Sequence, residues 1–247
     1  FVFSLPARIK NTINKKRGQY DFSHEVNESM QGCLACKSCV GQCPIKVDVP
    51  EFRSKFLELY YGRYLRPLKD YFIGALEYIM PTMVRVPWLY NGVMKPKVSQ
   101  KVLAKVAGMV DSPLLTGVNL DHALRELNVR YASAQNIASL NDEQKAKTVI
   151  LVQDAFTSYF ETELVLDSIK LLKILGFNPM LAPFKPNGKP LHVHGFLKAF
   201  AKAADNNATM LNALADTGIA LVGLEPSMTL AYRSEYQKVL GDKAPKV

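Results

Sequence analysis

The stretch GCLACKSCVGQCPIKVDVP, from Gly32 to Pro50, holds every cysteine of this 247-residue chain. Four thiols fall within eleven positions and follow the spacing C-x2-C-x2-C-x3-C-P, at Cys33, Cys36, Cys39 and Cys43. Thiols this close together in the sequence predict either a cross-linked loop or a site that binds a metal ion or a metal cluster.

Three kinds of site use cysteines that are close in the sequence. Cysteines three or four residues apart are poorly placed to form a disulfide with each other, and nothing else marks the chain as secreted. Structural zinc sites usually draw on two separated pairs of ligands. Three cysteines at three-residue spacing followed by Cys-Pro fit an iron–sulfur cluster better, since one loop can then present three thiolates to three irons. Pro44 lacks an N–H group and turns the chain away.

The same spacing predicts that the ligand set is incomplete. In this motif the fourth cysteine ligates a different cluster from the first three. We therefore expect Cys33, Cys36 and Cys39 to share one 4Fe–4S cluster and Cys43 to serve a second. The chain has no fifth cysteine. The missing ligands are expected on another part of a longer polypeptide or on a partner subunit.

Composition narrows the function classes without naming one. Apolar residues make up 48% of the chain and charged residues 21%, which is ordinary for a globular protein. The net charge of +9 is spread over scattered basic residues, so nucleic acid is not an expected partner. The most apolar window, Tyr71 to Tyr90, is too interrupted by charges and prolines to span a bilayer. The chain lacks an initiator Met, and we expect a piece of a longer protein.

The pattern of apolar residues predicts an α+β protein with two domains. Residues 1–135 read as helical, with a helix that begins after Asp48, ends near Gly62 and carries four apolar residues on one face: Phe52, Phe56, Leu59 and Tyr60. Further helices are expected at 68–80 and 98–107. Residues 136–247 read as a small α/β domain with a parallel sheet.

Strands and helices alternate in this second domain. The uncharged, β-branched run Thr148–Val152 predicts a buried strand, followed by further strands at 178–183 and 219–224. Helices are expected at 159–175, 195–204 and 208–216, with Gly176 as the C-terminal cap of the first. Three strands make a thin sheet.

Two other features are candidates for a site. His192 and His194 would point to the same side of an extended segment, where they could contact a substrate or cofactor. The alternative is a polar loop whose imidazoles contact backbone or water. Arg63 and Arg66, among the aromatics of Leu59–Pro67, could shield a cluster, or else simply pack against the core. No nucleophile elbow, Walker loop or G-x-G-x-x-G motif occurs, so the chain shows no catalytic constellation of its own.

The sequence CLACKSCVGQCPIKVDVPEFRSKFLELYYGRYLRP, Cys33–Pro67, resembles the C-terminal iron–sulfur region of bacterial FAD-linked oxidases of the D-lactate and D-2-hydroxyglutarate dehydrogenase type. The iron–sulfur subunits of glycolate oxidase and of anaerobic glycerol-3-phosphate dehydrogenase look like more distant relatives. The resemblance is strongest over Gly32–Pro67 and continues more weakly to Gly241.

This resemblance implies a redox function. The helical domain would be a ferredoxin-type iron–sulfur domain that passes electrons from FAD, through 4Fe–4S clusters, to a quinone or a redox protein. FAD and the oxidation of a 2-hydroxy acid would belong to an upstream domain or partner subunit, which would also supply the missing ligands. The parent would be cytoplasmic, with a further expectation of contact with the inner membrane surface.

The same resemblance covers the α/β domain only in part. This domain looks like one repeat of the family's cysteine-rich domain that lacks the cysteines, with Met228 where relatives often have Cys. It would then bind no cluster and be truncated after Val247. A second reading of the whole chain remains: a non-redox structural or interaction module, with its cysteines bound to zinc or unligated.

Overall fold

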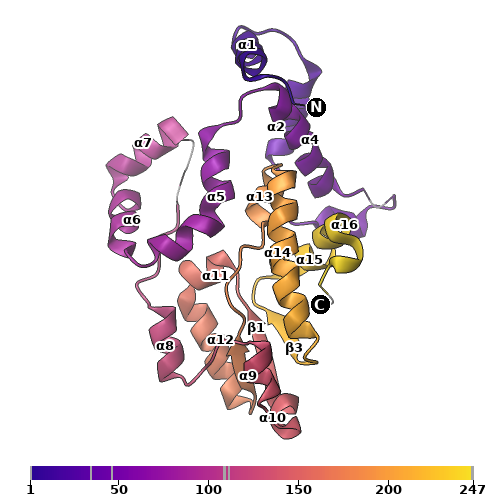
Figure 1. The fold of residues 1–247 in the computed structure, drawn as a ribbon. Coiled ribbons are helices and arrows are strands. Elements are labelled where there is room, and N and C mark those ends of the chain that lie inside the picture. Colours follow the sequence, from indigo (N-terminus) through magenta and orange to yellow (C-terminus); the bar gives the residue numbers. More distant parts are fainter. Residues whose placement is uncertain (1, 34, 46, 108–109, 111, 246–247) are drawn as a thin grey trace. The chain divides into compact units, whose positions relative to one another are not determined.

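The computed structural model describes residues 2–33, 35–45, 47–107, 110 and 112–245 (Figure 1). These residues pack into two compact units, each built from separate stretches of the chain. Unit 1 comprises the chain up to Ala75 together with Gly188–Phe200, and unit 2 comprises Leu76–Asn187 together with the chain from Ala201 onward. The sequence predicts two domains, residues 1–135 and 136–247, that fold independently. This division stays a prediction.

Unit 1 is helical in its described part. Its helices are α1 (Leu5–Lys16), α2 (Phe22–Gln31), α3 (Ser38–Gln42), α4 (Val49–Arg63) and α13 (Lys189–Val193). Two longer helices, α5 (Leu68–Met83) and α14 (Leu197–Ala215), contribute residues to both units.

Helix α4 begins where the sequence predicts. Asp48 is its N-cap, and the side chain accepts a hydrogen bond from the backbone N–H of Glu51 at 3.0 Å. Pro50 stands in the first turn, where a missing N–H leaves no hydrogen bond unmade. The helix ends at Arg63, one residue beyond the expected Gly62.

The buried face of α4 differs from the predicted one. Phe52, Phe56 and Tyr60 do form a stacked row, but Tyr60 alone of the three is buried. Leu59 and Phe52 expose 62% and 52% of their surfaces. The helix packs against α1, α2 and α13. Its buried residues include Ser54, whose small side chain permits a close approach.

The segment 188–200 packs against α4 within unit 1, and Gly195 shows how closely. A Cβ atom at this position would lie 2.7 Å from the Cβ of Leu57 and 2.8 Å from the carbonyl oxygen of Ser54. Its φ of +68° is also in the left-handed region, which glycine adopts without a steric cost. Glycine is therefore required here for two separate reasons.

Unit 2 is built on a parallel sheet, as predicted. In the described part of the chain the sheet has three strands in the order β2-β1-β3. The strands are β1 (Thr148–Val152), β2 (Asn178–Leu181) and β3 (Ala220–Gly223). In the central strand, Ile150 lies opposite Met180 on one side and Leu221 on the other.

Helices cover both faces of this sheet. Ile150 packs in one apolar cluster with Ile137 and Leu214, whereas the next residue, Leu151, packs in another with Val165 and Ile169. Successive side chains of a strand point to opposite faces, so burial on both sides explains the uncharged run of β1. The helices of unit 2 are α6 (Pro87–Met94), α7 (Lys97–Ala107), α8 (Leu120–Glu126), α9 (Ala134–Ala138), α10 (Asp142–Lys147), α11 (Ala155–Tyr159), α12 (Thr162–Ile174), α15 (Pro226–Arg233), α16 (Glu235–Leu240) and the 3-10 turn η1 (Gly241–Lys243).

Two predicted helical segments are divided differently in the structure. The helix expected at 159–175 is α12, which begins later, at Thr162, because Asp154 caps a separate short helix, α11, that ends at Tyr159. The two helices expected at 195–204 and 208–216 are the single helix α14. Within it, the amide of Asn207 donates to the carbonyl oxygens of Lys185 and Pro186 and so has partners outside the helix.

Among the described residues, no helix has the length and apolar content needed to cross a membrane.

Candidate metal centre

All four cysteines lie on one loop and one short helix of unit 1. Cys33 follows the end of α2, Cys39 is inside α3, and Cys43 is the residue that ends α3. None of the four forms a disulfide; Cys36 and Cys39 are exposed, and Cys33 and Cys43 are partly exposed. The thiols are thus accessible to a ligand that approaches from outside unit 1.

The backbone of the loop adopts a conformation that is costly for its residues. Ala35 and Lys37, on either side of Cys36, have φ values of 55° and 62°. The left-handed region costs an L-residue roughly 1–2 kcal/mol, so the surrounding structure must hold the loop in place. Ala35 is in fact buried, with 5% of its surface exposed. Left-handed residues of this kind are typical of loops that offer successive backbone N–H groups to an anion, including iron–sulfur sites.

The thiol of Cys36 is biased toward the form that binds metal. Its Sγ lies 3.6 Å from the hydroxyl oxygen of Ser38. Hydrogen bonding by the backbone N–H of Ser38, and then by its side chain, lowers the pKa of Cys36. Because the thiolate is the ligand form of cysteine, these contacts favour metal binding.

An arginine that the sequence did not single out holds the start of the loop. The carbonyl oxygen of Met30 accepts the backbone N–H of Cys33 at 3.2 Å and the Nε–H of Arg53 at 3.1 Å. Another guanidinium nitrogen of Arg53 donates to the carbonyl oxygen of Val193 at 2.6 Å. Arg53 therefore connects the end of α2, just before Cys33, to the segment 188–200.

A single metal ion and a cluster place different demands on the thiols. Among the described residues, no three His, Cys, Asp or Glu side chains converge on a position for a single metal ion. A structural zinc ion needs four ligands around one point. A cluster takes each thiolate on a different iron, so it accepts thiols that are farther apart. Which of the two groups the thiols hold stays a prediction.

The two histidines are not on an extended segment, which corrects the sequence expectation. His192 is inside α13 and His194 follows its last residue. His192 is buried, with Nδ1 at 3.3 Å from Ser54 Oγ and Nε2 at 3.3 Å from Glu51 Oε2. His194 Nδ1 lies 3.1 Å from Asp70 Oδ1. The rings thus face different carboxylates, on α4 and α5, and within the described residues they form no shared ligand pair.

Arg66 packs in the interior of unit 1, and its side chain exposes 6% of its surface. The guanidinium lies 3.9 Å from the ring centre of Phe196 and 4.4 Å from that of Tyr61. It also pairs with Asp70 at 3.6 Å and donates to the carbonyl oxygens of His194 and Gly195. These contacts agree with the alternative in which Arg66 packs against the core.

A second polar group holds the other end of α2, which leads into the thiol loop. The Asp21 side chain caps α2 and accepts a 2.6 Å hydrogen bond from the hydroxyl of Tyr64. That hydrogen bond is the main reason why the pKa of Asp21 falls to about 2. Burial raises the pKa of Tyr64 to about 12, so its hydroxyl stays protonated and keeps donating. Arg63 adds an ion pair to Asp21 at 3.0 Å.

The fold and this loop define a class: an α+β protein that joins a thiol-bearing helical unit to a three-stranded parallel sheet. Comparison with curated proteins gives the particular relatives. The chain is 56% identical over 244 residues to D-2-hydroxyglutarate dehydrogenase of Pseudomonas putida, covering 98% of this chain and 24% of that protein. It is 47% identical over 240 residues to D-2-hydroxyglutarate dehydrogenase of Escherichia coli, covering 97% and 24%.

A third relative, the D-2-hydroxyglutarate dehydrogenase of Haemophilus influenzae, is 46% identical over 240 residues, covering 97% of this chain and 23% of that protein. The chain therefore spans about a quarter of the length of the curated relatives it matches. No protein-family model and no solved structure matches it. The resemblance predicted from the cysteine motif, to dehydrogenases of the D-2-hydroxyglutarate type, is confirmed.

Proposed function

We propose that this chain is the electron-transfer part of a flavin-dependent 2-hydroxy-acid dehydrogenase. The observation that carries the proposal is the thiol loop, where four accessible cysteines stand on a backbone with two left-handed residues, Ala35 and Lys37. The relatives support it, since each is named a D-2-hydroxyglutarate dehydrogenase and the chain matches about a quarter of its length.

Each thiol has a role in this proposal. Cys33, Cys36 and Cys39 hold one 4Fe–4S cluster, and Cys43 serves a second. A bound cluster supplies one-electron transfer, from FAD in the upstream part of the parent protein to a quinone or redox protein. The chain's own contribution is to hold three thiolates, to lower the pKa of Cys36 through Ser38, and to fix the start of the loop through Arg53.

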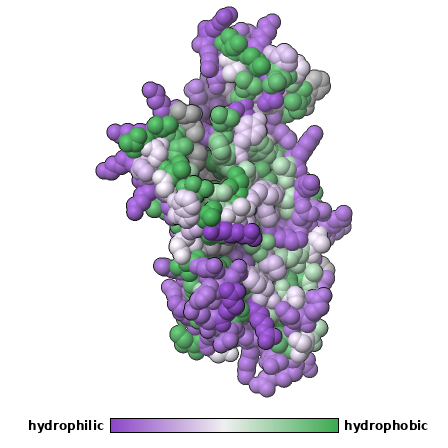
Figure 2. Space-filling model, turned by 60° about the vertical axis from the view of Figure 1, so that its left-hand side comes forward, coloured by the Kyte–Doolittle hydropathy of each residue, from purple (hydrophilic) through white to green (hydrophobic). Residues whose placement is uncertain are grey.

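The missing ligands are proposed to come from the flavin-bearing part, which would dock on unit 1. The first helix, α1, has an apolar face that is open to solvent: Leu5, Ile9 and Ile13 expose 60%, 41% and 45% of their surfaces. They line a groove of about 520 Å³. Figure 2 shows hydrophobic side chains gathered at the level of this helix, at the top of the view. An exposed apolar patch on a soluble unit typically marks an interaction site.

Unit 2 is proposed to be one repeat of the cysteine-rich type of domain without its thiols. All four cysteines lie between residues 33 and 43, so unit 2 has none, and Met228 is buried there. A unit without thiols serves packing and docking in this proposal. We place the parent protein in the cytoplasm, with contact at the inner membrane surface.

Cys36→Ser tests the ligand assignment in the full-length parent enzyme, purified without oxygen. The variant should lose about one cluster's worth of iron and sulfide, and reduction of FAD by substrate should continue while electron exit stops. Iron, acid-labile sulfide and zinc are measured together with the visible spectrum.

The control is Gln42→Ala, which changes an exposed residue of α3 that is not a thiol. It should keep its full iron content. Unchanged iron in Cys36→Ser, or stoichiometric zinc without sulfide in the wild type, would contradict the proposal and favour the structural module. The isolated chain, which lacks part of its ligands, should be largely apo when expressed in air.

A further inference from the structure

The helices α6 and α7 present an apolar surface of unit 2 to solvent. They pack against each other and lie side by side in Figure 1. Trp88, the single tryptophan of the chain, exposes 73% of its surface, and Val98 exposes 76%. The other exposed apolar residues of the two helices are Leu89, Val93 and Val102. Exposed apolar patches typically mark interaction sites, so this surface is a candidate for one.

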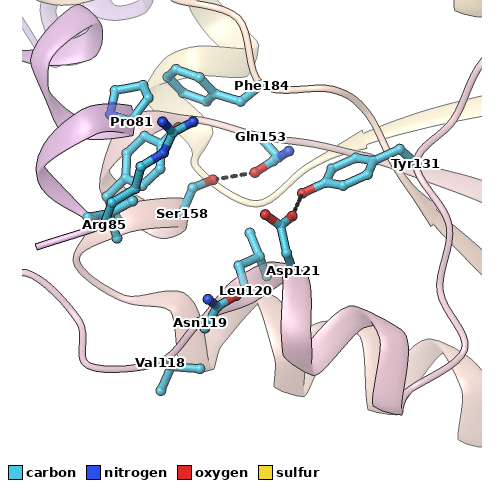
Figure 3. Close-up of a pocket in the computed structure, with 12 residues that line it drawn as sticks. Pro81, Arg85, Val118, Asn119, Leu120, Asp121, Tyr131, Gln153, Ser158 and Phe184 are labelled. Atoms are coloured by element: carbon cyan, nitrogen blue, oxygen red, sulfur yellow. Dashed lines mark hydrogen bonds between the residues drawn. The ribbon is translucent and has the colours of Figure 1, made fainter.

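The opposite side of α6 is held by unit 2. The side chain of Asn91 donates to the carbonyl oxygen of Leu115 at 3.0 Å and accepts the backbone N–H of the same residue at 2.8 Å. Arg85, just before α6, lines a cavity of unit 2 with a volume of about 260 Å³ (Figure 3). Residues four apart share one face of a helix, so Leu89 and Val93 lie together, away from the face that carries Asn91.

Lysines lie beside the apolar residues of α7. Lys97, Lys101 and Lys105 are four residues apart, and Val98 and Val102 each follow one of them. All five side chains are exposed. Because side chains four apart lie on the same face of a helix, a row of lysines runs beside a row of valines. Figure 2, in which this side comes forward, shows hydrophobic and hydrophilic side chains next to each other at the height of the two helices.

The charge of this surface has one sign. Lys95, between α6 and α7, is exposed and adds to the three lysines of α7. No Asp or Glu stands between Glu77 and Asp111, so no acid along this segment neutralises the charge. Clusters of lysines next to apolar side chains are attracted to anionic lipids.

The lysines favour a bilayer over a protein as the partner. Lysine is depleted in protein–protein interfaces, whereas lysines beside tryptophan and aliphatic side chains are typical of helices that lie on a bilayer. The apolar face of α1 differs in this respect, because two basic residues of that helix have partners inside unit 1. Arg8 donates to the carbonyl oxygen of Tyr64, and Lys15 donates to the hydroxyl of Tyr60.

We propose that α6 and α7 dock on a bilayer with anionic headgroups. The side chains of Trp88, Val98 and Val102 enter the headgroup region, and the lysines beside them extend to the lipid phosphates. This inference rests on the contact with the inner membrane surface that the proposed function includes, and it names the part of the chain that makes this contact. The thiol loop takes no part in it.

Sedimentation with vesicles tests the proposal in the full-length parent enzyme. The wild type should bind vesicles of equimolar phosphatidylcholine and phosphatidylglycerol at least about tenfold more tightly than vesicles of phosphatidylcholine alone. High salt should weaken this binding, because it screens exposed charges. Replacing Lys97, Lys101 and Lys105 together with Gln should weaken binding by about a hundredfold. Trp88→Ala should weaken it by about tenfold, since an apolar side chain no longer leaves water.

The control removes the same charge elsewhere on unit 2. Lys147, Lys170 and Lys202 are exposed on α10, α12 and α14, and replacing these three with Gln should change binding by less than about twofold. Thermal unfolding confirms that each variant is folded. Iron content and reduction of FAD by substrate are measured on the same samples, because a lack of clusters would contradict the electron-transfer proposal and not this one. A wild type that does not bind the anionic vesicles, or equal binding by the two triple variants, overturns the proposal.

Discussion

The guanidinium of Arg53 lies 3.1 Å from the carbonyl oxygen of Met30, the same oxygen that accepts the backbone N–H of Cys33. This carbonyl oxygen therefore accepts hydrogen bonds both from a side chain of α4 and from the first cysteine of the motif. Because Arg53 also reaches Val193, the position of the first cysteine depends on a segment far along the chain.

Arg53→Gln should destabilise unit 1 and loosen the thiol loop. It removes hydrogen bonds from a charged donor to two carbonyl oxygens, which should lower the free energy of unfolding by about 2–3 kcal/mol. Urea-induced unfolding of the chain measures this loss. In the full-length enzyme the variant should also release iron faster to a chelator.

Lys55→Gln is a matched control on the same helix. Lys55 is 65% exposed and pairs with Glu51 at 3.1 Å. An exposed pair of this kind contributes about 0.5 kcal/mol or less. Equal losses in the two variants would contradict the anchoring role of Arg53.

Gly195→Ala should be more destabilising than a change of backbone preference alone. The new methyl group would stand 2.7 Å from the Cβ of Leu57, in addition to the strain at a φ of +68°. Gly18 isolates the second effect, because its φ is +81° and nothing lies within 4 Å of an added Cβ. Gly18→Ala should cost about 1 kcal/mol and Gly195→Ala at least about 2 kcal/mol. Thermal or urea unfolding compares them.

Acid should weaken unit 1 through Asp21. Its pKa is lowered from 3.8 to about 2 in the folded state, so the native state favours the ionised carboxylate. The stabilisation is present above pH 4 and is lost as the pH falls from 4 toward 2. Given that Asp21 is partly exposed, we expect a loss of about 1 kcal/mol.

The variant that checks this effect is Tyr64→Phe, which removes the hydrogen bond to Asp21. The pKa of Asp21 should rise toward its ordinary value, and the loss of stability between pH 4 and 2 should shrink. NMR titration of the Asp21 carboxyl carbon measures the pKa directly. A titration midpoint that does not move would show that Tyr64 is not the cause.

His192→Ala should lower stability, because Ser54 and Glu51 lose a buried partner and a space is left beside Phe200. We expect a loss of about 1–3 kcal/mol in urea unfolding. His122→Ala is the control, since its side chain is 64% exposed and should change stability little. In the full-length enzyme, the double variant of His192 and His194 tests substrate contact: turnover that is lost while the clusters stay intact and the protein stays folded supports it.

The local features of the fold were predictable because their causes lie within a few residues. The Asp48 cap of α4 is recognisable from Asp followed by Pro in the first turn. The uncharged β1 requires cover on both faces, and both apolar clusters include one of its residues. The helical turn at His192 also has a signal in the sequence, since a glycine, Gly188, precedes α13 and Pro190 stands in its first turn.

The contacts that support the thiol loop were not predictable, because they join distant parts of the chain. Arg53 has no motif around it that indicates Val193 as its partner. No motif indicates the partners of Asn207 either. Its side chain donates to the carbonyl oxygens of Lys185 and Pro186, and α14 continues through this residue although the sequence suggested a break. The cysteines themselves were recognisable by spacing, whereas the left-handed Ala35 was not, since alanine rarely adopts that conformation.

The dependence of unit 1 on residues 188–200 also sets an order of events during synthesis. Arg53 and Val193 are 140 residues apart, which a ribosome covers in roughly 7–28 s at typical rates of 5–20 residues per second. For most of that interval the four thiols are made but the segment that braces their loop is not. Iron delivered during translation would meet an unsupported motif, so a cluster on these thiols would be expected to assemble only after residues 188–200 have been made.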